Sequence, residues 1–242
     1  MRVGIVTVGD ELLAGETTNT NAAWLAEEVT RRGGRVERIV TIPDEPETVA
    51  DQVATSHDQF DAVIVTGGLG GTHDDLTVPA VADALDREVV VDDSARSAVR
   101  ESAAALADAE PELVDEYDLS FDLDAWASLP AGARHVENPV GLAPGAVVDG
   151  VYLLPGVPSE MQGVFGGVAD EFGGDRVSRS IQTPTPEGAM AETLAAVGDQ
   201  FDVAVGSYPS RSDQIVRIRV SGTELPAVER ALDWLRDRIE TV

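Results

Sequence analysis

Runs of apolar residues alternate with amphipathic segments along the first 172 residues of the chain. Short β-branched runs at 3–8, 35–41 and 62–65 are typical of buried strands. Apolar residues at helical spacing predict helices at 21–32, 45–56, 77–85, 93–109 and 159–172. The stretch 111–130 reads as a helix fragment and a loop. This alternation predicts an α/β fold with three layers, in which helices cover both faces of a mostly parallel sheet.

Two further features complete the predicted architecture. Asp149-Gly150 separates two apolar runs, which is a strong signal for an antiparallel hairpin. After residue 175 the pattern changes to strand, helix, strand, strand and helix, which predicts a small α+β domain. We therefore expect one domain at 1–172 and a second at 176–242.

The charge distribution supports this division. Residues 176–242 carry 10 acidic residues and 8 arginines, whereas nearly all of the chain's net charge of −27 falls on the residues before them. The acidic residues are scattered through amphipathic segments and all 17 basic residues are arginine. We favour adaptation to high salt over an acidic binding tail, since dense carboxylates keep a surface hydrated and salt screens their repulsion. So negative a field argues against nucleic acid and anionic membrane as partners.

Composition excludes several classes of site. The chain has no cysteine, so disulfides, thiolate metal sites and a cysteine nucleophile are excluded. No apolar run approaches the length of a membrane helix, and the N-terminus resembles no signal peptide, so we expect a cytoplasmic protein. A P-loop is excluded because it needs a lysine. We expect His57 and His135 to be surface or loop residues, while His73 lies within the glycine–acid loop described next.

A strand that ends in a run of glycines carries the main chemical signal. Gly67, Gly68, Gly70 and Thr72 follow the predicted strand at 62–65, at the sheet edge where ligands of open α/β folds bind. Glycines let backbone N–H groups approach a phosphate closely. Asp74 and Asp75 come next, and carboxylates beside a phosphate need a bridging cation such as Mg²⁺. A tight turn whose aspartates cap the following helix explains the same residues equally well.

Three other loops rich in turn-forming residues lie at the ends of predicted strands. The first contains Asp10, the second contains Asn138 and Gly141, and the third contains Pro155, Gly156 and Ser159. Each taken alone is an ordinary loop. Together with the glycine run they favour one shared site.

These four segments together resemble the N-terminal domain of the competence/damage-inducible CinA family, a branch of the MoaB/Mog (molybdopterin-binding) superfamily. The resemblance covers about residues 1–172, and the remainder resembles the small KH-like domain that follows in CinA proteins. It implies a molybdopterin-type or nucleotide ligand, and functional aspartates at the positions of Asp75 and Asp44. Gly71 replaces the proline usual in the family. Since the family's deamidase domain is not part of this chain, deamidation is not expected.

The resemblance leaves three functions open. The first is divalent-metal-dependent hydrolysis of ADP-ribose-like pyrophosphates, with Asp74, Asp75 and Asp10 or Asp44 at the metal. The second is a module that binds a pterin or nucleotide without chemistry, and the third is adenylyl transfer to molybdopterin. We also expect a homo-oligomer. Arg217 and Arg219 alternate along a predicted strand, so they share a face that is either solvated or packed against an acidic surface.

Overall fold

The computed structural model describes residues 1–70, 75–109, 122–210 and 215–242. It divides into two compact units, one formed by 1–28 with 36–172 and the other by 29–35 with 173–242. Residues 29–35 join the second unit because the chain passes very close to itself at two glycines. A Cβ on Gly33 would lie 2.3 Å from the carbonyl oxygen of Gly174. Among the described residues, no helix is long and apolar enough to cross a membrane.

The first unit is a three-layer α/β domain. Its elements are β1 (Arg2–Val8), α1 (Asp10–Leu13), α2 (Thr20–Arg31), β2 (Arg35–Ile42), α3 (Pro46–Gln59), β3 (Ala62–Thr66), α4 (Thr77–Ala84), β4 (Val89–Val91), α5 (Asp93–Ala109), α7 (Leu123–Trp126), β5 (Ser128–Pro130), β6 (Arg134–Val136), β7 (Gly145–Val148), β8 (Val151–Leu154), α8 (Pro158–Gly166) and η1 (Ala169–Phe172). Six strands form one sheet in the order β2-β1-β3-β8-β7-β6. The central strands β1, β3 and β8 are parallel, and β7 and β6 add an antiparallel edge. The predicted fold class is confirmed.

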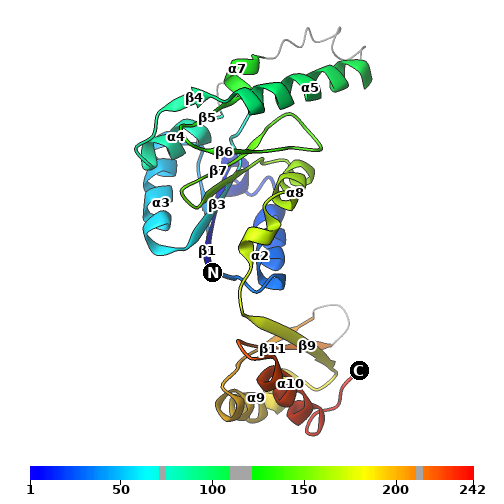
Figure 1. Cartoon of the computed structure of the whole chain (residues 1–242). Coiled ribbons are helices and arrows are strands. Elements are labelled where there is room, and N and C mark those ends of the chain that lie inside the picture. The colour runs from blue at the N-terminus through cyan, green and yellow to red at the C-terminus, as the bar shows by residue number, and fades with distance from the viewer. Residues whose placement is uncertain (71–74, 110–121, 211–214) are drawn as a thin grey trace. The chain divides into compact units, whose positions relative to one another are not determined.

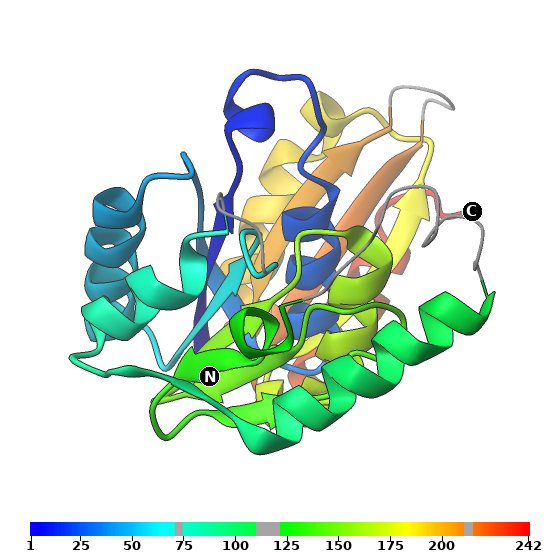
Figure 2. The same cartoon turned by 90° about the horizontal axis from the view of Figure 1, so that it is seen from above.

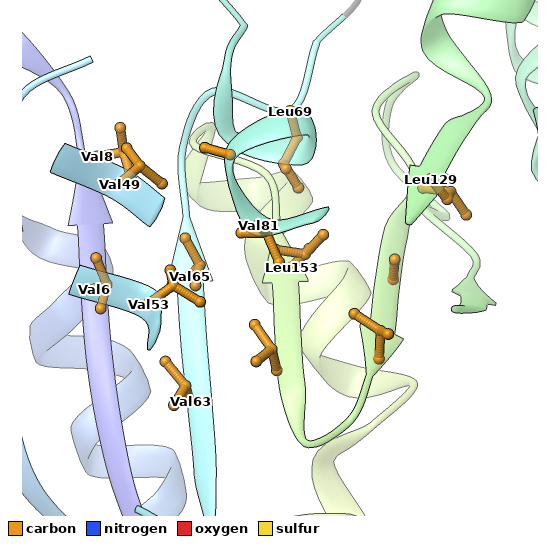
Figure 3. Packing of buried hydrophobic residues seen from close by; sticks show 14 of the residues in the cluster. Val6, Val8, Val49, Val53, Val63, Val65, Leu69, Val81, Leu129 and Leu153 are labelled. Atoms are coloured by element: carbon orange, nitrogen blue, oxygen red, sulfur yellow. The ribbon is translucent and has the colours of Figure 1, made fainter. Parts of the chain in front are cut away.

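Alternating side chains of the central strands build a core on each face of this sheet. Val6, Val63 and Leu153 point toward α3 and α4 (Figure 3). Ile5 and Ile64, one position along in each strand, are also fully buried, as the two-residue period of a strand requires when both faces are covered. Figures 1 and 2 show α3 and α4 on one side of the sheet and α2 and α8 on the other.

Some predicted elements differ from the structure. The expected helix at 159–172 is two elements, because α8 ends at the pair Gly166-Gly167 and a short 3-10 helix follows. Three short strands, β4, β5 and β6, were not expected, because three residues are too few to show a period. His135, which we expected on a surface loop, lies in β6 and is half-buried. His57 is exposed as expected, in the last turn of α3.

The second unit is the small α+β domain that the pattern predicts. Its elements are β9 (Val177–Thr183), α9 (Glu187–Phe201), β10 (Ala204–Pro209), β11 (Val216–Gly222) and α10 (Leu225–Arg236). The antiparallel sheet has the order β10-β11-β9, and α9 and α10 cover one face (Figure 1). Ile218 and Val220 are buried beneath the helices, whereas Arg217 lies 5.4 Å from the ring centre of Tyr208. Packing of the arginine-bearing face on a partner stays a prediction.

Candidate functional site

The glycine run lies directly after β3, where two hydrogen bonds tie it to the turn after β8. Thr66 Oγ1 donates to the carbonyl of Pro155 at 2.7 Å, and the N–H of Gly67 donates to Leu154 at 3.2 Å. Gly67 and Gly68 have φ angles of 110° and 64°, which favour glycine strongly. A Cβ on Gly67 would also lie 2.3 Å from the carbonyl oxygen of Val8. The two glycines therefore let three segments meet at one sheet edge.

The main chain of the glycine run is also in contact with a carboxylate. A Cβ on Gly70 would lie 2.2 Å from Oδ2 of Asp75, so this carboxylate rests against the glycine main chain. Thr77, at the start of α4, donates through Oγ1 to the carbonyl of Gly67 at 2.7 Å and so closes the turn. Thr72 and Asp74, the other residues that we expected at the site, lie outside the described residues, as does His73.

A cavity of about 810 Å³ opens beside this turn. Gly68, Gly70 and Asp75 line it, together with the predicted residues of the two companion loops, which are Asn138, Gly141, Pro155 and Gly156. Its volume falls within the ~300–1,000 Å³ typical of small-molecule sites. The structure thus brings three of the four predicted segments to one cavity. Gly67 and Ser159 neighbour lining residues and are not themselves part of the lining described.

Asn138 holds the loop at 138–143 in shape. Its Nδ2 donates to the carbonyl of Ala143 at 2.8 Å and to Oε2 of Glu160 at 2.6 Å. Its Oδ1 accepts from the backbone N–H groups of Val140 and Gly141, at 3.1 and 3.0 Å. One side chain therefore satisfies both ends of the loop and also links it to α8.

Glu160 brings a second carboxylate to the cavity, and sequence reasoning missed it. It lies in the first turn of α8, where acidic residues are common because they complement the helix dipole. A Cβ on Gly141 would fall 2.1 Å from the carboxyl carbon of Glu160, so this carboxylate fills the space that glycine leaves. The only sequence signal was its place one residue after the predicted Ser159.

Another part of the cavity lining is mostly apolar and was also missed. Ser102, Ala105 and Leu106 come from one face of α5, and Trp126 ends α7. The spacing of the α5 residues matches the buried Ala95 and Val99 on the same helix, so the sequence reads as a core-facing stripe. Nothing in that pattern indicates that half of the stripe faces a cavity.

Asp10 and Asp44 lie away from this cavity. Oδ2 of Asp44 accepts from the backbone N–H of Asp10 at 2.8 Å, at the start of α1. Neither residue is among those that line the cavity, and the roles expected for them stay predictions. Asn21 lies closer to the cavity, because its Nδ2 donates to the carbonyl of the lining residue Gly156 at 2.7 Å. This hydrogen bond fixes the turn after β8.

The cavity lining includes oxygen donors of the type that hard divalent cations take. In the described part of the chain, no three Asp, Glu or His side chains converge as a metal-ligand group. Asp75 and Glu160 are nevertheless oxygen donors on one cavity. Mg²⁺ usually keeps several waters and binds through one or two carboxylates together with substrate phosphates, so a protein cage of three ligands is not required.

Comparisons with known proteins agree with this geometry. Residues 4–172 match the family model described as probable molybdopterin binding domain, and residues 175–242 match the model of the middle domain of FAD synthase. The second match differs from the KH-like description that the sequence suggested for this segment.

Individual relatives are also similar over most of the chain. A protein of Aeropyrum pernix is 45% identical over 219 residues, which cover 88% of this chain and 75% of that protein. A CinA-like protein of Salinibacter ruber is 35% identical and covers 96% of this chain, which in turn spans 59% of that longer protein. The crystal structure of the protein CinA from Thermoplasma acidophilum aligns with a TM-score of 0.62 at 30% identity, covering 72% of this chain and 99% of that chain.

Proposed function

This chain belongs to the molybdopterin-binding domain family, and from that premise we propose that its cavity binds a phosphate ester of a nucleotide or pterin and hydrolyses ADP-ribose-like pyrophosphates with a divalent cation. One observation carries the proposal. Two carboxylates, Asp75 and Glu160, line the same cavity as the glycine main chain of the phosphate-type turn. Two anionic side chains beside an anionic ligand repel it unless a cation lies between them.

In this proposal the glycine backbone and the two carboxylates have different roles. The backbone at Gly68–Gly70, which has no side chains at its two glycines, approaches the pyrophosphate closely. Asp75, held against Gly70, and Glu160, held by Asn138, would hold the cation. A bound divalent cation lowers the pKa of a water ligand and offsets charge on the phosphate that leaves.

The reaction is a hydrolysis that balances without a redox partner. The water oxygen bonds to one phosphorus, the P–O bond of the bridge breaks, and the products are AMP and ribose 5-phosphate. The proton of the attacking water passes to a carboxylate or to solvent. Asp44 and Asp10 take no part in this scheme, because they contact each other outside the cavity.

The test is hydrolysis of ADP-ribose in molar KCl with and without Mg²⁺, followed by product chromatography. We expect turnover that needs the metal and falls at least about 100-fold in Asp75→Asn, as removal of a charge-stabilising group commonly costs. Asp51→Asn, an exposed position on α3, is the matched control and should keep full activity. No turnover by the wild type, or full turnover by Asp75→Asn, would contradict the hydrolase.

The match to the molybdopterin-binding family favours two alternatives that use the same cavity. A binding module would hold a nucleotide with a dissociation constant near the micromolar range, about −8 kcal/mol, and release no product. An adenylyltransferase would restore molybdopterin adenylylation in cells that lack that enzyme. Calorimetry without product formation indicates the first alternative, and complementation indicates the second.

A further inference from the structure

A second, smaller hollow borders the main cavity. It measures about 280 Å³ and shares Leu69, Gly70, Asp75 and Trp126 with the larger one. The shared residues include both members of the Gly70–Asp75 contact, which is the proposed phosphate position. The two hollows therefore meet where the ligand's phosphates would lie.

The walls that belong to the small hollow alone are almost entirely apolar. They include Val78 and Pro79 from α4, Ala125 from α7 and Leu129 from β5. Val89, in the short strand β4, also lines it and is 42% exposed, so the hollow is accessible to solvent. An anionic group placed there would lose its hydration and lie near the carboxylate of Asp75, whereas a flat uncharged ring would gain apolar contact.

Trp126 stands between the two hollows. It is the last residue of α7, its side chain packs on the core, and it lines both spaces. Asp122 caps this short helix by accepting from the N–H groups of Asp124 and Ala125. A salt bridge of 2.6 Å between Arg96 and Asp124 ties it to α5. The indole is therefore held in place as a wall that can contact ring systems on either side.

We propose that the small hollow is a second ring-binding subsite, so that the ligand is a pyrophosphate or phosphodiester with an organic group at each end. The phosphates lie at Gly70 and Asp75, one end occupies the large cavity, and a flat uncharged ring lies in the small hollow against Trp126. This inference rests on the proposed phosphate position. It makes Ala125, Val89 and Trp126 specificity-determining residues.

Binding calorimetry with Mg²⁺ tests the subsite separately from catalysis. The ligands are ADP, which has one ring end, and the methylene analogue of diadenosine diphosphate, which has two uncharged ring ends and resists hydrolysis. The wild type should bind the two-ended ligand at least about tenfold more tightly, equivalent to ~1.4 kcal/mol. Ala125→Trp, which fills the small hollow, should abolish this preference, so that the two ligands bind with similar affinity. Ala104→Trp, an exposed α5 position that lines neither hollow, should behave like the wild type.

A second variant and a second measurement distinguish loss of the subsite from misfolding of Ala125→Trp. Val89→Trp fills the same hollow from β4 and should reproduce the effect of Ala125→Trp. The two-ended ligand should change tryptophan fluorescence in the wild type, and this change should be lost in Trp126→Phe, which keeps Trp24 and Trp234.

Equal binding of the two ligands by the wild type, or a preference that survives both filling variants, would overturn the subsite. Tight binding of the two-ended ligand without turnover of ADP-ribose would overturn only the hydrolase. If neither ligand binds, the phosphate position and the subsite are both wrong.

Discussion

The two walls of the cavity are built by different means. The polar wall, which we define as Asn138, Gly141 and Glu160, is fixed by side-chain hydrogen bonds and by a contact that only glycine permits. The apolar wall, defined as Ala105, Leu106 and Trp126, is part of two helices whose shape does not depend on the cavity. Loss of the hydrogen bonds of the polar wall should therefore alter both fold and ligand binding, whereas a change in the apolar wall should alter binding alone.

The largest effect is expected at Asn138, where the two roles coincide. Asn138→Ala removes two donated and two accepted hydrogen bonds of a partly buried side chain. At about 1 kcal/mol for each bond, the free energy of unfolding should fall by about 2–4 kcal/mol. Urea denaturation measures it, and ligand affinity should be lost in the same variant.

Asn138→Asp sharpens this test. It keeps the acceptor for the loop N–H groups, loses the donors, and places a carboxylate 2.6 Å from Oε2 of Glu160. We expect a loss of stability that lessens as pH falls and the carboxylates are protonated. A stable Asn138→Ala variant with normal ligand affinity would show that the polar wall contributes neither to stability nor to binding.

Gly141→Ala should separate shape from stability within the polar wall. The new Cβ would lie 2.1 Å from the carboxyl carbon of Glu160, which stands at the end of a flexible side chain. The glutamate can move aside, so the free energy of unfolding should change by less than about 1 kcal/mol. The displaced Glu160 carboxylate can then no longer bind the proposed cation. Metal-dependent ligand binding should therefore weaken by about tenfold.

The control for Gly141→Ala is Gly166→Ala in α8, where no heavy atom lies within 4 Å of the added Cβ. This change should stabilise the protein by about 0.5–1 kcal/mol, because alanine favours the helix, and should leave binding alone. If both variants bind ligand normally, the position of Glu160 does not matter to the site.

Leu106→Ala tests the apolar wall. The side chain is half-buried and lines the large cavity, so its loss should cost little stability. Removal of its methyl groups should weaken ligand binding by about fivefold, or ~1 kcal/mol, from lost apolar burial. Isothermal titration measures the affinity and thermal unfolding measures the stability. A large loss of stability with unchanged affinity would reverse the contrast between the two walls.

The same contrast explains what the sequence could predict. Glycine, proline and asparagine in loops have local conformational reasons to be there, and these reasons pointed to Gly68, Gly70, Asn138, Gly141 and Gly156, which the structure brings together. The strand pattern gave the fold because β1 and β3 are buried on both faces, and the CinA and MoaB/Mog resemblance is confirmed.

The rest could not be predicted, for two physical reasons. Leu106 and Trp126 look like ordinary core residues, because a helical stripe does not show where the core ends and a cavity begins. Glu160 looks like an ordinary acid in a first helical turn. The resemblance pointed to Asp44, whose carboxylate accepts a backbone hydrogen bond at the start of α1, and its chemical role stays a prediction. The metal and the substrate stay predictions.

The smallest effect is expected at Asp92, which supports the apolar wall from a distance. It precedes α5, and its Oδ1 accepts from the hydroxyl of Ser94 at 2.5 Å and from the N–H of Ala95 at 2.8 Å. These hydrogen bonds, that from Ser94 first, hold the pKa of Asp92 below its usual value. Asp92→Asn keeps an N-cap acceptor and removes only the charge, so near pH 7 the free energy of unfolding should fall by a few tenths of a kcal/mol.

The sign of the pH dependence follows from this lowered pKa. A carboxyl that is more acidic in the folded state contributes stability above its unfolded pKa of about 3.9, and that contribution is lost as pH falls through the lower folded value. The difference between the wild type and Asp92→Asn should therefore be constant from about pH 5 to 7 and should close below about pH 4. Urea denaturation of both proteins across this range measures the difference, in which the general effect of protonating so acidic a protein cancels. If the stability difference between the two proteins instead increased toward low pH, Asp92 would be uncharged in the folded protein. Hydrogen bonds alone would then stabilise the start of α5.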